Sequence, residues 1–195
     1  MKSKFTCRLL PLLFVAAPVL AVAADNSDYL QQSRRIAQTF MQRLGGTLKS
    51  QLASAGPAGA IGVCKLVAPA LAAEYSRDGF LVSRVSLKTR NQTLGSPDAW
   101  ERNMLEKFDR QQTQGTAPTE ISEVIEQADG RWFRYLKAIP TQPMCLQCHG
   151  QPADMTSEVK TMLAREYPQD QAVGYRVGDI RGAITIKRKL GDADE

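Results

Sequence analysis

The spacing of apolar residues predicts a chain that begins with helices. Between residue 26 and about residue 54, apolar side chains recur every four positions, as on one face of a helix. These residues are Ile36, Phe40, Leu44, Leu48 and Leu52. Gly56-Pro57 interrupts the pattern, and a second helix is expected from Pro57 to about Tyr75. Pro69 lies inside this second helix, so a kink or an early end is expected there.

The second half of the chain has the pattern of strands with two more helices among them. Strands are expected over residues 79–87, 119–127, 132–139 and 182–188, and helices from about 96 and over 157–166. Asp129-Gly130 separates the second and third strands and is a strong signal for a tight hairpin. Helices followed mainly by strands predict an α+β fold with an antiparallel sheet, as a single domain over residues 24–190 with a polar tail at 191–195.

The N-terminus has the pattern of a secretory signal peptide. Three basic residues within the first eight precede an apolar run from Leu9 to Leu20, and Ala21-Val22-Ala23-Ala24 offers a cleavage site. We therefore expect a signal peptide over residues 1–23 and a periplasmic, soluble mature protein. The apolar run is shorter than the roughly 20 residues of a spanning helix, and no membrane span is expected in the mature chain.

Removal of this segment changes the meaning of the net charge. The whole chain carries +5, and residues 1–23 contain three basic and no acidic residues, so +5 minus 3 leaves +2. Most of the basic excess is thus part of the export signal, and a nucleic-acid partner, which is not expected, loses its main support. The 43% hydrophobic and 23% charged composition is that of an ordinary globular protein.

The segment Cys145-Leu146-Gln147-Cys148-His149 has the C-x-x-C-H pattern of covalent haem c attachment. Two thiols at this spacing suit the two vinyl groups of haem, and the adjacent imidazole suits the iron. The alternatives are a redox C-x-x-C pair or half of a zinc site, which would need two more ligands. His149 is the one histidine of the chain, so a bis-histidine site within the chain is excluded.

The second axial ligand of such an iron is an open question. Once the signal peptide is removed and haem takes two cysteines, Cys64 is left as a lone thiol in an oxidising compartment. Cys64 is either a buried core residue or an iron ligand. The other candidates are Met41, Met104, Met144, Met155 or an empty position.

Six short segments occur together and in order along the chain. They are Val63-Cys64-x-x-Val67-Ala68-Pro69, Val85-Ser86-Leu87-Lys88-x-Arg90-Asn91, Pro97-Asp98-x-Trp100-Glu101, Cys145-x-x-Cys148-His149-Gly150, Tyr167-Pro168-x-Asp170-x-Ala172-x-Gly174-Tyr175 and Gly178-Asp179-x-Arg181-Gly182-Ala183. This set resembles the PAS-like c-type haem family whose iron is held by cysteine and histidine. The family's domain occurs alone and as the sensor part of bacterial signalling proteins. One departure is Gln92, where the family usually has proline.

The resemblance implies a PAS-like antiparallel sheet and one haem c, bound covalently by Cys145 and Cys148. It also implies His149 and Cys64 as the two axial ligands of the iron. Because an axial thiolate favours ferric iron, a low-potential haem is expected.

The resulting hypothesis is a redox or gas-ligand sensor, which would need a diatomic gas ligand or a protein redox or signalling partner. The alternative is a periplasmic electron-transfer cytochrome. An enzymatic role is disfavoured, since no second histidine can act as a distal acid–base group. Six arginines are candidates for pairing with haem propionates or for solvated surface charge, namely Arg84, Arg90, Arg131, Arg134, Arg176 and Arg181.

Overall fold

The computed structural model describes residues 26–115 and 119–191. The helices are α1 (Asn26–Gly62), α2 (Ala68–Tyr75), α3 (Gln92–Gly95), α4 (Ala99–Thr113), α5 (Leu146–His149) and α6 (Ser157–Glu166). The strands are β1 (Phe80–Val85), β2 (Glu120–Gln127), β3 (Gly130–Pro140) and β4 (Ile180–Lys189). The expected signal peptide and residues 192–195 of the expected tail lie outside the described residues.

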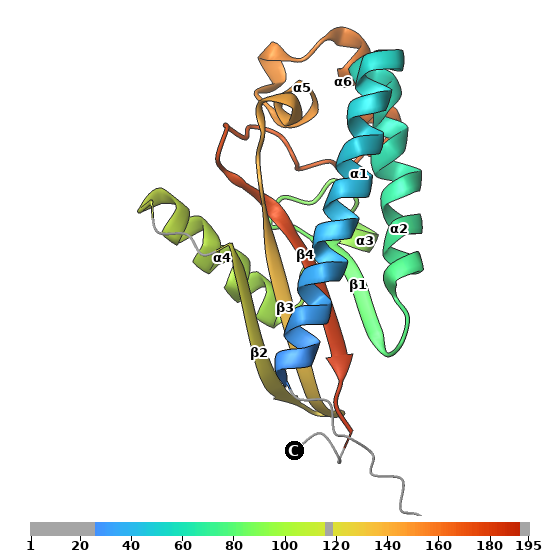
Figure 1. The fold of residues 1–195 in the computed structure, drawn as a ribbon. Helices are drawn as coiled ribbons and strands as arrows, with labels where there is room; N and C mark the ends of the chain where they lie inside the picture. The colour runs from blue at the N-terminus through green and yellow to red at the C-terminus, as the bar shows by residue number, and fades with distance from the viewer. Residues whose placement is uncertain (1–25, 116–118, 192–195) are drawn as a thin grey trace, which may run out of the picture.

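The four strands form one antiparallel sheet in the order β1-β4-β3-β2. Strands β2 and β3 are joined by the tight turn that Asp129-Gly130 predicts. Helices α1 and α2 lie side by side along one face of the sheet, whereas α4 lies on the opposite side (Figure 1). The expected α+β class, with N-terminal helices and an antiparallel sheet, is confirmed.

Side chains alternate between the two faces along each strand, so each face of the sheet has its own apolar core. On the face that meets α1 and α2, a buried cluster contains Phe40, Leu71, Tyr135 and Ile186, with other strand residues of the same parity. On the opposite face, Leu136, Ala138 and Ala183 pack with Leu105 and Phe108 of α4. Helix α4 begins where the sequence predicts, because Asp98 and Glu101 form a capping box.

The two N-terminal helices form a hairpin whose second arm contains an irregular turn. Gly56 makes the bend with a φ of +65°, a conformation that glycine adopts without steric cost, and Pro57 starts the second arm. Of the kink or early end expected at Pro69, the early end is not seen, because the helix continues to Tyr75. Instead a π-helical turn, Val63–Val67, precedes the proline, and the Ala68 N–H donates to the carbonyl of Val63. This wider turn accommodates a residue that has no N–H of its own to donate.

The helical region Asn26–Tyr75 contains an 18-residue stretch that is long and apolar enough to cross a membrane by length and composition alone. The apolar pattern of the sequence did not indicate this. The core helix of a soluble protein passes the same test, and this region does supply Phe40 and Leu71 to the core. However, only 28% of the stretch is buried, so this part of the hairpin presents apolar surface.

Candidate functional site

The C-x-x-C-H segment lies at one end of the sheet, where β3 has ended at Pro140. A 3₁₀ turn, Pro143–Cys145, leads into the single turn of α5. Helix α5 lies beside the bend of the helical hairpin and near α6 (Figure 1). Cys145 and Cys148 are both partly buried free thiols, so neither is consumed by a disulfide in the described part of the chain.

Cys148 faces an apolar cluster formed by the second arm of the hairpin and α6. It packs against a core that contains Ile61, Met155 and Leu163. Its thiol lies 3.9 Å from the carbonyl oxygen of Pro57, just after the bend. Burial raises the pKa of this thiol, and the nearby Arg90 guanidinium opposes that rise. Cys148 therefore joins the C-x-x-C-H turn to the N-terminal helices.

His149 is held in the tautomer that suits a metal ligand. Its Nδ1 lies 2.7 Å from the carbonyl oxygen of Ala172, which can only accept, so Nδ1 carries the hydrogen. The lone pair of the neutral ring is therefore on Nε2. Burial, followed by repulsion from Arg181 and Arg90, places the pKa of His149 well below its ordinary value. A neutral imidazole with Nδ1 anchored to a carbonyl is the usual form of a histidine ligand.

A cation and an aromatic ring lie against this imidazole. The Nε of Arg181 is 3.1 Å from Nδ1 and 3.4 Å from Nε2, and its Nη1 donates to Ser86 Oγ at 2.8 Å. The Tyr175 ring meets His149 edge-on, with centroids 6.2 Å apart, and Arg181 lies over the same ring. Burial lowers the pKa of Arg181 to about 10. The positive charge of Arg181 therefore lies directly against the imidazole of His149.

Cys64 reaches this region from a distant part of the sequence, on the π-helical turn. Its thiol is partly buried and close enough to act electrostatically on Cys148, Tyr167 and Arg181. Lys65, the next residue, forms an ion pair with Glu166 at the end of α6. The fold therefore brings the lone cysteine to the same end of the molecule as the C-x-x-C-H segment.

The methionines proposed as alternative ligands are separated by the fold. Met41 packs against the core between the helical hairpin and the sheet, and Met104 packs against the core under α4. Met155 is 5% exposed and lies in the same cluster as Cys148, and Met144 directly precedes Cys145. Two of the four methionines, Met144 and Met155, are therefore near the C-x-x-C-H segment.

The six candidate arginines fall into different environments. Arg134 is buried against Asp98 and Glu101, and Arg131 pairs with Glu126, so both serve other parts of the sheet. Burial of Arg134 contradicts a surface role for that residue. The three arginines whose charge acts on His149 are Arg84, Arg90 and Arg181. Arg176 is exposed.

Two residues of the site, Asp170 and Ser86, were given no chemical role by the sequence pattern, although they lie in its recognisable segments. Asp170 forms a nearly buried ion pair with Arg90, and its other oxygen accepts from the Ala172 N–H at 2.8 Å. Ser86 accepts from Arg181. Gln92, the departure from the family pattern, opens α3, and Asn91 caps that helix through a bond from the Leu94 N–H. Proline is well tolerated at the first helical position, so either residue allows the same turn.

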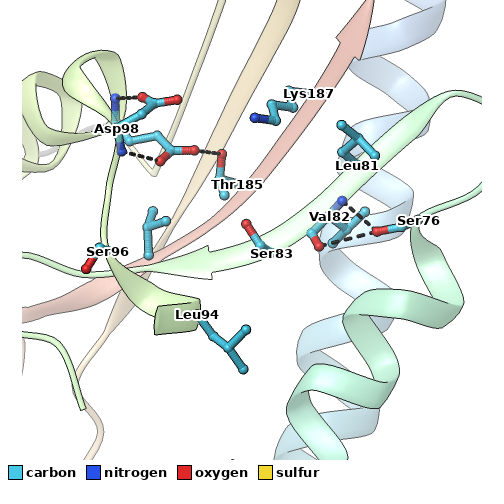
Figure 2. A pocket seen from close by; sticks show the side chains of 11 residues that line it. Ser76, Leu81, Val82, Ser83, Leu94, Ser96, Asp98, Thr185 and Lys187 are labelled. Atoms are coloured by element: carbon cyan, nitrogen blue, oxygen red, sulfur yellow. Dashed lines mark hydrogen bonds between the residues drawn. The ribbon is translucent and has the colours of Figure 1, made fainter. Parts of the chain in front are cut away.

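The described surface also has a hollow of about 340 Å³ that is unrelated to the cysteines. It lies on the α4 side of the sheet, between Leu94 of α3 and the strand residues Leu81, Ser83 and Lys187 (Figure 2). Its carboxylates, Asp98 and Glu101, are engaged by Arg134. Within residues 26–115 and 119–191, no three His, Cys, Asp or Glu side chains gather as a metal site would require.

Comparison with known proteins agrees with the architecture. A family model described as Tll0287-like, Tll0287, matches residues 17–188. The crystal structure of the cyanobacterial haem protein Tll0287 is similar, with a TM-score of 0.60 and 22% sequence identity over 85% of this chain and 94% of that chain. No curated protein matches the chain. The expected PAS-like α+β fold is confirmed by this likeness.

Proposed function

The chain belongs to the Tll0287-like family, and on this premise we propose that it is an exported protein that binds one haem c. Cys145 and Cys148 form the two thioether bonds, and His149 and Cys64 are the axial ligands. The protein acts as a periplasmic sensor of redox state or of a diatomic gas. The observation that carries this proposal is the orientation of His149: its Nδ1–H is bound to the Ala172 carbonyl, so the lone pair available to a metal is on Nε2, where Arg181 Nε is its neighbour at 3.4 Å.

The residues around this histidine fit a haem group. Two free thiols at the C-x-x-C spacing lie next to the imidazole, and the cluster of Ile61, Met155 and Leu163 offers an apolar wall. The apolar stretch of the helical hairpin, of which 28% is buried, provides further surface for a flat apolar ligand. Positive charge from Arg84 and Arg181 suits the two propionates.

The chemistry of a sensor follows from the choice of axial ligands. The bound haem would supply a redox-active iron, which a cysteine thiolate stabilises in the ferric form. Cys64 lies on a π-helical turn, a local irregularity that often occurs at functional sites. Its segment is tied to α6 by an exposed Lys65–Glu166 pair, a weak link of at most about 1 kcal/mol. A change in the ligation of the iron by Cys64 would move this turn, and the movement would pass to the rest of the helical hairpin.

Electron paramagnetic resonance and visible spectra of the haem-loaded protein test the ligand set. We expect a low-spin thiolate signature in the wild type that is lost in Cys64→Ser. Met155→Leu is the matched control, because it removes another sulfur from the Cys148 cluster with little loss of packing. Loss of the signature in the methionine variant, with an unchanged spectrum in Cys64→Ser, would overturn the Cys64 assignment.

Addition of carbon monoxide to the same reduced samples separates the sensor from an electron carrier. A spectral change on adding the gas supports a sensor of ligands. No change, together with fast electron exchange with a partner cytochrome, supports the electron-transfer alternative. Absence of covalently bound haem in the wild type would refute both roles.

A further inference from the structure

A buried ion pair, Arg90–Asp170, lies next to the proposed axial histidine and has no part in the ligand set proposed above. Arg90 and Asp170 are 7% and 10% exposed at their side chains, and their charged atoms are 3.1 Å apart. Arg90 belongs to the segment after β1, and Asp170 to the loop after α6. A buried pair seldom stabilises a fold more than apolar residues of the same volume would, so its position calls for another explanation.

The Arg90 guanidinium holds two backbone carbonyls that belong to the histidine's surroundings. Its Nη2 donates to the carbonyl of Cys148, the residue before His149. The same nitrogen donates to the carbonyl of Ala172 at 3.3 Å. That carbonyl also accepts the Nδ1–H of His149 at 2.7 Å. Arg90 and His149 therefore share one acceptor.

Asp170 closes the arrangement from the other side. Its Oδ2 accepts from Arg90 Nε at 3.1 Å, and its Oδ1 accepts from the N–H of Ala172 at 2.8 Å. The carboxylate thus fixes both the cation and the peptide that receives the histidine's hydrogen. Hydrogen bonds connect His149 through Ala172, Asp170 and Arg90 to Cys148, and the Cys148–His149 peptide bond closes the ring.

We propose that Arg90 and Asp170 are positioning residues that set the electron-donating strength of His149, and with it the reduction potential of the bound haem. Arg90 competes for the Ala172 oxygen and so weakens the Nδ1–H bond, which makes the imidazole a poorer donor. Its positive charge also disfavours ferric iron relative to ferrous iron. Asp170 opposes both effects by neutralising Arg90. This inference rests on the proposed haem function.

The two members of the pair therefore have opposite expected effects. In Arg90→Gln, His149 no longer shares the Ala172 oxygen with a cation, and the negative charge of Asp170 is no longer neutralised. The reduction potential of the haem should therefore fall. Asp170→Asn leaves the Arg90 charge unbalanced, so the potential should rise. We expect each shift to be about tenfold in the ferric–ferrous equilibrium, which is 59 mV for one electron. A residue that only maintained the fold would give shifts of the same sign, or lost haem, in both variants.

The test is redox titration of the haem-loaded wild type, the two single variants and Arg90→Lys, which keeps the charge without the planar fork. Arg90→Lys should lie closer to the wild type than Arg90→Gln does. Arg102→Gln is the control, because it removes the same charge from an exposed site on α4 and should leave the potential unchanged. Shifts of equal sign in Arg90→Gln and Asp170→Asn, or no shift beyond that of Arg102→Gln, would overturn the inference.

Two further outcomes keep this inference apart from the proposed function. If the wild type carries no covalent haem, the proposed function itself is wrong. If Arg90→Gln does not fold, the other two variants test the inference. The reduction potential must then still rise in Asp170→Asn and change little in Arg90→Lys.

Discussion

At the scale of single residues, Gly150 shows how closely the C-x-x-C-H turn is packed. A Cβ atom at this position would lie 2.6 Å from the carbonyl oxygen of Leu146, at the start of α5. The Gly150 N–H donates to the same oxygen at 2.9 Å, and its own carbonyl accepts from Gly174. No flexible side chain is available to move, so a larger residue must displace the backbone that carries Cys148 and His149.

We therefore expect Gly150→Ala to lower both the covalent haem content and the stability of the protein. Strain of this kind costs about 1–3 kcal/mol, and haem content per protein, measured by absorbance, should fall severalfold. Gly46→Ala is the matched control, because that glycine lies in α1 with nothing within 4 Å of the added methyl group. Because alanine forms helices better than glycine, Gly46→Ala should leave the free energy of unfolding unchanged or raise it by up to about 1 kcal/mol. Equal haem content in the two variants would contradict the steric explanation.

At the scale of elements, Glu120 of β2 anchors the first half of α1 to the sheet. Its carboxylate accepts from Arg34 of α1 and from the buried Tyr135 hydroxyl at 2.9 Å. Burial alone would raise the pKa of Glu120, but the hydrogen bonds and charges of Arg34, Tyr135 and Lys137 lower it below its ordinary value. The carboxylate thus adds stability above the unfolded pKa, and this contribution is lost as the pH falls through the folded pKa.

Glu120→Gln should accordingly destabilise the protein by about 1–2 kcal/mol at pH 7. The difference from the wild type should shrink as the pH falls from the ordinary glutamate pKa of about 4.3 through the lower folded pKa, where Glu120 loses its charge and becomes neutral like glutamine. Urea unfolding at pH 7 and at pH 3.5 measures this difference. Glu126→Gln on the same strand serves as the control, since its side chain is 76% exposed and should change stability by less than about 0.5 kcal/mol. A loss that is the same at both pH values would exclude the charge as its source.

Local patterns predict most elements of this fold because local interactions determine them. The four-residue apolar repeat, the Asp129-Gly130 signal and the helix expected from about residue 96 each correspond to an observed helix or hairpin. The π-helical turn before Pro69 was not predicted, since a proline can be accommodated by a kink, an end or a wider turn. No local pattern specifies which of the three occurs.

The candidate site was predictable only in part, for a similar reason. The C-x-x-C-H spacing identifies three of its residues by chemistry alone, and the family resemblance adds Cys64. The roles of Asp170 and Ala172 depend on where a loop after α6 returns to α5. The sequence likewise could not distinguish the arginines near His149 from those elsewhere, because the fold places them on different faces and at different ends of the sheet.

At the scale of the whole molecule, the proposed site joins two parts of the chain that otherwise have few polar links. Cys64 belongs to the second arm of the helical hairpin, and His149 to the connection between β3 and α6. Between these parts lie the Cys148–Pro57 contact at 3.9 Å and the exposed Lys65–Glu166 pair. A cofactor ligated from both sides would therefore act as a cross-link and suppress local opening of the hairpin.

Hydrogen exchange of the haem-loaded protein measures this cross-link. In Cys64→Ser, amides of residues 57–75 should lose at least tenfold protection relative to the wild type, or about 1.4 kcal/mol. The amides of β4 should be unaffected, because Ile184 and Ile186 are fully buried in the core between the hairpin and the sheet. Equal protection of residues 57–75 in the two proteins would mean that Cys64 does not hold the hairpin to the site. Uniform loss over both regions would indicate global destabilisation rather than a released ligand.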